Sequence, residues 1–166
     1  MDVPMELSRI LITELGDQQV IFLREKNGER TFPIMIGISE AIAIDRRLKG
    51  KPTPRPMTHD LLYECIRAMD ATVNRIEIVD IRNNTFFASI YLTREGQTYA
   101  IDARPSDAIA LALRARASIF VEEIVLEKSR NIDFGMKIGD IDKFKEDKIR
   151  EFLENLSAED FGKYKM

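Results

Sequence analysis

The strongest constraint on the fold is an internal repeat with an offset of 67 positions, the distance from Ser39 to Ser106. At this offset the phrase SEAIAI, residues 39–44, lies over SDAIAL, residues 106–111. The residues upstream also match in type: Thr31 with Thr98, Phe32 with Tyr99, Ile34 with Ile101 and Leu23 with Ile90. Because the order of strand and turn patterns matches as well, the sequence predicts two copies of a strand-strand-strand-helix unit.

Hydrophobic runs and turn residues place the elements of each unit. The expected elements are strands at 7–12, 19–23 and 31–36 before a helix at 39–48, and strands at 73–81, 85–93 and 97–101 before a helix from 106. Asn27-Gly28 is a strong hairpin pattern, and Gly50 is expected to end the first helix. The prediction is an α+β fold in which a mostly antiparallel, barrel-like sheet is packed with helices.

Two segments lie outside the repeat alignment. The proline-rich stretch 51–56 is a connector to a helix from Thr58, whose apolar residues are expected to form one buried face. These residues are Leu61, Leu62, Cys65, Ile66 and Met69. A further strand is expected at 118–121.

The C-terminal part has a different character, and we divide the chain into a main domain at 1–139 and a helical tail at 140–166. The tail carries one amphipathic stripe on a strongly charged helix. The stripe consists of Phe144, Ile149, Phe152, Leu153 and Leu156. We expect it to pack on the main domain or on a second subunit, and we expect a homodimer.

Charge and cysteine content restrict the setting. The net charge of −3 and the pI near 5.4 argue against a dedicated nucleic-acid binder, although they leave room for a local basic patch. Cys65 cannot form a disulfide within one chain, which favours a reducing, cytoplasmic location. The sequence contains neither a secretory leader pattern nor a run of about 20 apolar residues, so we expect no membrane span.

The repeat also sorts the polar residues. Glu40 and Asp107 each follow a serine expected to cap a helix, so a purely structural role explains both. Asp102 and Arg104 have no polar counterpart, because Met35 and Gly37 occupy their positions in the first unit. Residues that break the repeat are better candidates for function.

His59 is the single histidine of the chain, so a two-histidine metal site within one chain is excluded. It lies in the phrase Thr58-His59-Asp60, with Arg55 shortly before it. One interpretation is the polar first turn of a capped helix. The other makes His59 a general acid or base that Asp60 orients, with Arg55 in contact with substrate.

The second candidate constellation runs from Asp102 to Asp107, at a strand-to-helix turn. Arg104 and Ser106 could bind an anionic substrate at the helix N-terminus. Alternatively, Asp102 and Asp107, with Glu40, could bind Mg²⁺ or Mn²⁺. A plain ion pair between Arg104 and an acid is the structural explanation.

Four phrases in order, FPIMIGISEAIAI, RPMTHDLL, NNTFFASIYL and IDARPSDAIALALRARASIFV, resemble the bifunctional nuclease domain family over about residues 8 to 128. The resemblance implies a compact α+β domain and, as for some plant members, nuclease activity on both RNA and DNA. We expect a divalent metal to assist this hydrolysis. It marks Glu40, Arg55, His59, Asp60, Asp102, Arg104 and Asp107 as the polar positions to test. The competing hypothesis is a non-catalytic regulatory module that binds an anionic ligand or a partner protein.

Overall fold

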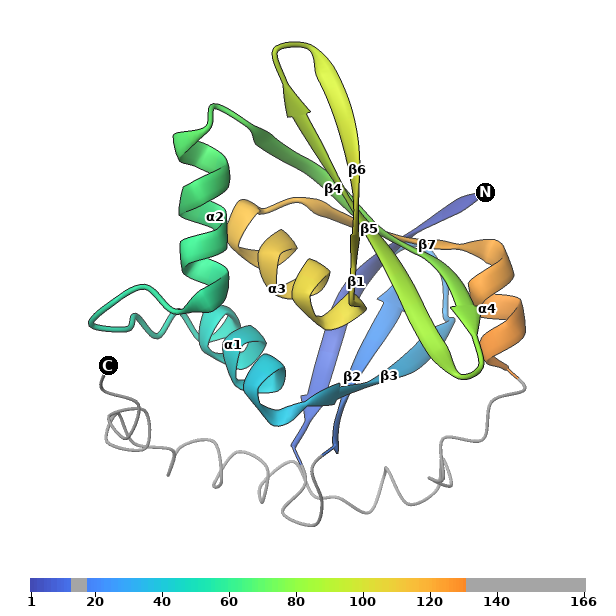
Figure 1. The fold of residues 1–166 in the computed structure, drawn as a ribbon. Coiled ribbons are helices and arrows are strands. Elements are labelled where there is room, and N and C mark those ends of the chain that lie inside the picture. Colours follow the sequence, from blue (N-terminus) through green and yellow to red (C-terminus); the bar gives the residue numbers. More distant parts are fainter. Residues whose placement is uncertain (13–17, 131–166) are drawn as a thin grey trace.

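Seven strands form one sheet in the order β3-β2-β1-β7-β4-β5-β6, as seen in a computed structural model that describes residues 1–12 and 18–130 (Figure 1). The strands are β1 (Asp2–Leu11), β2 (Gln18–Glu25), β3 (Thr31–Gly37), β4 (Thr72–Arg82), β5 (Thr85–Arg94), β6 (Gln97–Ala103) and β7 (Ser118–Glu122). The helices are α1 (Ile38–Leu48), α2 (Thr58–Ala68), α3 (Pro105–Ala115) and α4 (Glu123–Ser129). The predicted α+β class is confirmed.

The predicted duplication is confirmed as well. Shifting α1 by 67 positions gives residues 105–115, which are the bounds of α3. The first unit, β1-β2-β3-α1, and the second, β4-β5-β6-α3, form the two halves of the sheet. Strand β7 joins them, because it pairs antiparallel with β1 and parallel with β4.

The core lies on the face of the sheet that the helices cover. Ile21 and Leu23 on β2 are buried there, and Ala88 and Ile90 occupy the equivalent buried positions on β5. The sheet curls into a half-barrel around this core, so that the rings of Phe32 on β3 and Phe86 on β5 lie only 5.7 Å apart. This curvature agrees with the barrel-like sheet predicted from the sequence.

The two halves differ at their outer strands. Phe32 and Ile34 on β3 are 3% and 2% exposed, whereas Tyr99 and Ile101 at the equivalent positions on β6 are 46% and 45% exposed. Both strands are edges of the sheet, so the difference lies in what covers their side chains: those of β3 are buried in the core, and those of β6 lie in solvent.

The prediction that the apolar stripe of α2 is buried is wrong. Leu61 and Met69 are more than half exposed, and the Cys65 thiol is exposed too. Of the five predicted residues, Ile66 does pack against the core, together with Tyr63, which was not predicted. The reason is that α2 lies at the margin of the helical layer beside α3, so only one narrow side of it faces the protein (Figure 1).

The helices begin earlier than predicted, so serine is not the capping residue. Gly37 and Arg104 precede the first turns of α1 and α3, and Pro105 occupies the first position of α3. The predicted end of α1 is confirmed, because Gly50 has a φ of +60° just beyond it. Within residues 1–12 and 18–130, no helix is long and apolar enough to cross a membrane.

The expected tail helix at 140–166, with its stripe from Phe144 to Leu156, lies outside the described residues. The domain boundary at 139, the cytoplasmic location and the homodimer stay predictions.

Candidate functional site

His59 and Asp107 meet where two helices begin. His59 lies in the first turn of α2 and Asp107 in the first turn of α3, and Nε2 of His59 lies 2.9 Å from Oδ1 of Asp107. The side chain of His59 is only 12% exposed. The contact holds one ring nitrogen against a carboxylate and so orients the imidazole ring.

Arg104 connects this pair to the first repeat. Its Nε donates to Oδ2 of Asp107 at 2.7 Å, and its Nη2 donates to Oε1 of Glu40 at 2.9 Å. Burial opposes the ionisation of Asp107, but the hydrogen bonds from Arg104 and His59 outweigh it and lower the pKa of Asp107. Asp107 is therefore a carboxylate with both oxygens engaged, one by an arginine and one by the histidine.

Asp60 forms a second, neighbouring contact. Its Oδ1 accepts a hydrogen bond from Nε of Arg114 at 2.5 Å, and its Oδ2 accepts one from the backbone N–H of Met57 at 3.0 Å. Although burial opposes its ionisation, the Met57 amide and Arg114 together lower the pKa of Asp60. Asp60 thus secures the start of α2 and does not orient His59.

Arg114 is nearly buried, with 7% of its side chain exposed. It also donates to the carbonyl oxygens of Ala110, at 2.8 Å, and Ala43, at 3.4 Å. The sequence interpretation missed this residue. The pattern that could have revealed it is a charged residue four positions after Ala110, on the apolar side of α3.

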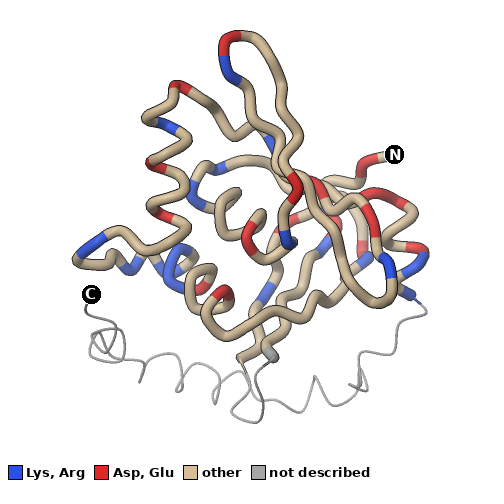
Figure 2. Tube along the Cα trace, viewed as in Figure 1, with Lys and Arg blue, Asp and Glu red and all other residues tan. Residues whose placement is uncertain are grey.

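A basic hollow of about 460 Å³ opens beside Asp60 and Arg114, between the end of α1 and the proline-rich connector. Basic residues outnumber acids in its lining, which includes Arg46, Arg47, Lys51, Arg55, Arg114, Asp60 and Glu64. Figure 2 shows the positive residues gathered at the end of α1 and along the loop into α2. Such a hollow suits an anionic ligand in a protein whose net charge is −3.

Asp102 and Ser106 do not join the network. Asp102 is exposed on β6 and alternates with Ala103, which packs against the core, so the two side chains point to opposite faces of the sheet. Ser106 is 6% exposed, inside the first turn of α3.

The three predicted metal ligands, Glu40, Asp102 and Asp107, therefore do not converge. A positive charge, that of Arg104, already lies between Glu40 and Asp107. Within the described part of the chain, the acids that do converge in a group of three are Asp2, Glu77 and Glu122. They belong to three strands, and no sequence pattern could have grouped them before the strand order was known.

Comparison with known proteins bears on the activity. A family model described as the bifunctional nuclease domain matches residues 21–133. An uncharacterised protein of Mycobacterium tuberculosis is 37% identical over 161 residues, which cover 92% of this chain and 93% of that protein.

Two rice proteins are more distant. Bifunctional nuclease 1 of Oryza sativa is 25% identical over 105 residues, and bifunctional nuclease 2 is 28% identical over 114 residues. The matched segments cover 61% and 66% of this chain but only 32% and 35% of the rice proteins. The chain thus corresponds to about a third of each rice nuclease.

Proposed function

Because the chain belongs to the bifunctional nuclease domain family, we propose that it hydrolyses phosphodiester bonds of RNA or DNA. The observation that carries the proposal is the contact between His59 and Asp107. His59 directly precedes Asp60, which lines the basic hollow. The rice relatives named as bifunctional nucleases support the same class of reaction.

In the proposed reaction, His59 is the general base. Asp107 accepts a hydrogen bond from Nε2–H of His59, so that Nδ1 carries the lone pair that takes a proton from water. The resulting hydroxide attacks phosphorus, and the bond from phosphorus to the leaving sugar oxygen breaks. The proton on His59 then passes to that oxygen, so the enzyme returns to its starting state.

Arg104 is a positioning residue in this scheme, because it holds the oxygen of Asp107 that His59 does not contact. Substrate phosphates would bind in the hollow through Lys51 and Arg55, which reach it from the connector. Arginine and lysine at this place would offset the charge that develops on the phosphoryl oxygens.

The expected Mg²⁺ or Mn²⁺ does not fit Glu40, Asp102 and Asp107 as they stand. Arg104 occupies the space between two of these acids, and the third faces away. No step of the proposed reaction passes through a metal. Metal dependence stays a prediction, and cleavage assays in Mg²⁺, in Mn²⁺ and in EDTA test it.

One observation favours a second function, a regulatory module that binds an anionic ligand without cutting it. The side chain of His59 is 12% exposed, which is little for a group that must reach water. The hollow would serve such a ligand equally well.

The deciding experiment compares cleavage of labelled RNA and DNA by the parent protein, by His59→Gln and by the control Glu64→Gln. Glu64 lines the hollow, but it forms an ion pair with Arg67 on the same helix. We expect the His59 variant to lose at least about 100-fold in rate, the usual contribution of general acid–base catalysis. Equal cleavage by all three preparations would overturn the proposal, and retained binding of the nucleic acid in that case would favour the regulatory module.

We also propose that the protein forms a homodimer through β6. An edge strand with Tyr99 and Ile101 in solvent offers both unpaired backbone groups and apolar surface. A second copy related by a twofold axis would pair the same strand with itself. Sedimentation analysis measures the mass of the protein in solution and so distinguishes a dimer from a monomer.

A further inference from the structure

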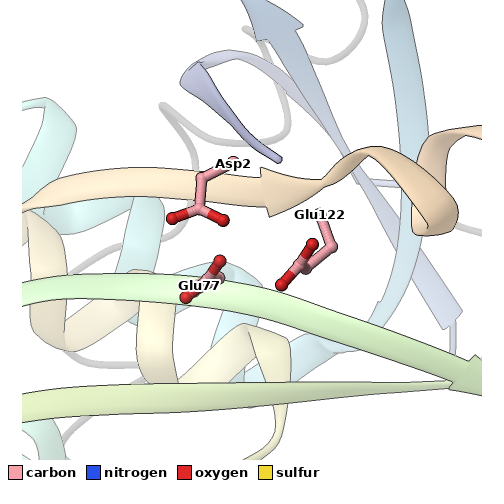
Figure 3. Close-up of side chains that lie close together, drawn as sticks. All are labelled: Asp2, Glu77 and Glu122. Atoms are coloured by element: carbon pink, nitrogen blue, oxygen red, sulfur yellow. The ribbon is translucent and has the colours of Figure 1, made fainter.

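Three acids from three adjacent strands face one another on the sheet. Asp2 lies on β1, Glu77 on β4 and Glu122 on β7, and one carboxylate oxygen from each lies within 4.8 Å of the others (Figure 3). Asp2 and Glu122 are direct neighbours in the pairing of β1 with β7. The three strands meet at the junction of the two repeats.

The cluster lies on the face opposite to the His59 site. Ile76 and Ile78, on either side of Glu77, point into the core that the helices cover. Since successive side chains of a strand alternate, Glu77 points to the other face. The cluster is therefore separate from the proposed nuclease site and does not depend on that function.

Glu77 is the residue that points to a ligand. It is only 2% exposed, and its Oε1 has no hydrogen-bond partner among the residues that the structure describes. A buried carboxylate oxygen without a donor is costly, so a positive charge or a proton is needed beside it.

Arg75 does not fill this place. Its guanidinium lies between the rings of Tyr91, at 4.7 Å, and Phe120, at 5.4 Å. From there it donates to Asp2 at 2.9 Å and, less closely, to Oε2 of Glu77 at 3.3 Å. The two rings hold Arg75 on one side of the cluster, and Oε1 of Glu77 is left to another partner.

Among residues 1–12 and 18–130, the other cation paired with the cluster is the amino group of Met1, 3.5 Å from Oε2 of Glu122 and 89% exposed. Three carboxylates thus face Arg75 and one exposed amine, so negative charge is left over. Carboxylate oxygens are the ligands that hard divalent cations prefer.

We propose that Asp2, Glu77 and Glu122 bind one divalent cation of the Mg²⁺, Mn²⁺ and Ca²⁺ class. The ion would join β1 to β4 and β7 and so fasten the two repeats together at their junction. Its role would be to stabilise the fold, because a ligand that binds only the folded protein raises its stability.

The test uses the full chain with a native N-terminus and no histidine tag, stripped with a chelator and then titrated with Mn²⁺. We expect one ion per chain with a Kd below about 1 mM, the weakest range seen for oxygen-ligand cation sites. At 100 times Kd the Tm should rise by about 5–10 °C.

Two variants and one control make the result specific. Glu77→Gln and Glu122→Gln should each weaken Mn²⁺ binding at least tenfold, and Glu6→Gln, on the same strand as Asp2 but paired with Arg24, should bind as the parent does. Without metal, Glu77→Gln should be at least as stable as the parent, because it removes a buried charge. Glu122 is partly exposed, so its variant keeps the test valid if the Glu77 variant does not fold.

The proposal is overturned if the parent binds no Mn²⁺ at 1 mM. In that case a proton shared by Glu77 and Asp2, and not a metal ion, would neutralise the cluster. It is equally overturned if both glutamine variants bind Mn²⁺ as the parent does. Cleavage activity is no part of the readout, so failure here leaves the proposed nuclease function standing.

Discussion

Nη2 of Arg104 lies 2.9 Å from Oε1 of Glu40, and the two residues belong to different repeats. In the first repeat the position of Arg104 is occupied by Gly37. A Cβ at Gly37 would lie 2.4 Å from Oε2 of Glu40, so the carboxylate of Glu40 rests against the glycine. One arginine and one glycine at equivalent positions therefore build the link between the starts of α1 and α3.

Replacing Arg104 by lysine should slow cleavage at least about tenfold with little loss of stability. Lysine cannot donate to Asp107 and Glu40 at once in the planar geometry of a guanidinium. The side chain of Arg104 is 67% exposed, so its ion pairs should contribute no more than about 1 kcal/mol to folding. Cleavage rates and urea denaturation measure the two effects, and an unchanged rate would remove Arg104 from the site.

Replacing Asp60 by asparagine should lower the free energy of unfolding by about 2 kcal/mol, because Arg114 loses the charge that pairs with it in a nearly buried position. The matched control is Glu64→Gln, which affects an exposed pair with Arg67 and should change stability by less than about 0.5 kcal/mol. Urea denaturation compares them. Equal stability of both variants would show that the contact between Asp60 and Arg114 contributes nothing to folding.

Stability should fall in acid because of Asp107 and Asp60. Both have a pKa below the ordinary value of 3.8 in the folded protein. Their contribution is therefore fully present above about pH 4 and is lost as the pH falls through the lowered folded pKa values. Urea denaturation between pH 2 and 5 should show this loss, and Asp107→Asn should have a shallower pH dependence than the parent; a dependence identical to the parent's would contradict the assignment.

The basic hollow should make binding of single-stranded nucleic acid depend on salt. If Lys51 and Arg55 each contact a phosphate, the double variant Lys51→Gln/Arg55→Gln should reduce the slope of log K against log salt by about 1.4. The control Lys26→Gln/Arg116→Gln removes the same charge from residues outside the hollow. Fluorescence anisotropy at several salt concentrations measures the slopes, and equal slopes for the two double variants would place the nucleic acid elsewhere.

Much of this fold follows from its sequence because the repeat and the alternation of apolar residues are local patterns. The offset of 67 gave the bounds of α3 from those of α1, and it marked Arg104 as the residue that breaks the symmetry. The sequence also shows polar residues at the expected helix starts. This local pattern identified His59, Asp107 and Glu40 as candidates.

What the sequence could not provide depends on partners far away along the chain. Asp60 was expected to orient His59, but in the structure it pairs with Arg114 on α3, which lies 54 residues later in the chain. The apolar stripe of α2 was misassigned because periodicity shows that a helix has an apolar face but not what covers it. Asp2 and Glu77 meet only through the order of the strands.

The last prediction concerns the exposed edge of β6. If two copies pair along this strand, Ile101→Lys should place a charge in the interface and convert the dimer to a monomer. Ile101 is 45% exposed in the single chain, so the change should leave the stability of the monomer within about 0.5 kcal/mol. The matched control is Leu61→Lys, which puts the same charge on the exposed face of α2, where leucine is 56% exposed. Sedimentation equilibrium should give a dimer for the parent and the control and a monomer for Ile101→Lys. A dimer that survives Ile101→Lys but is lost with Leu61→Lys would move the interface from β6 to α2, and a monomeric parent would remove it altogether.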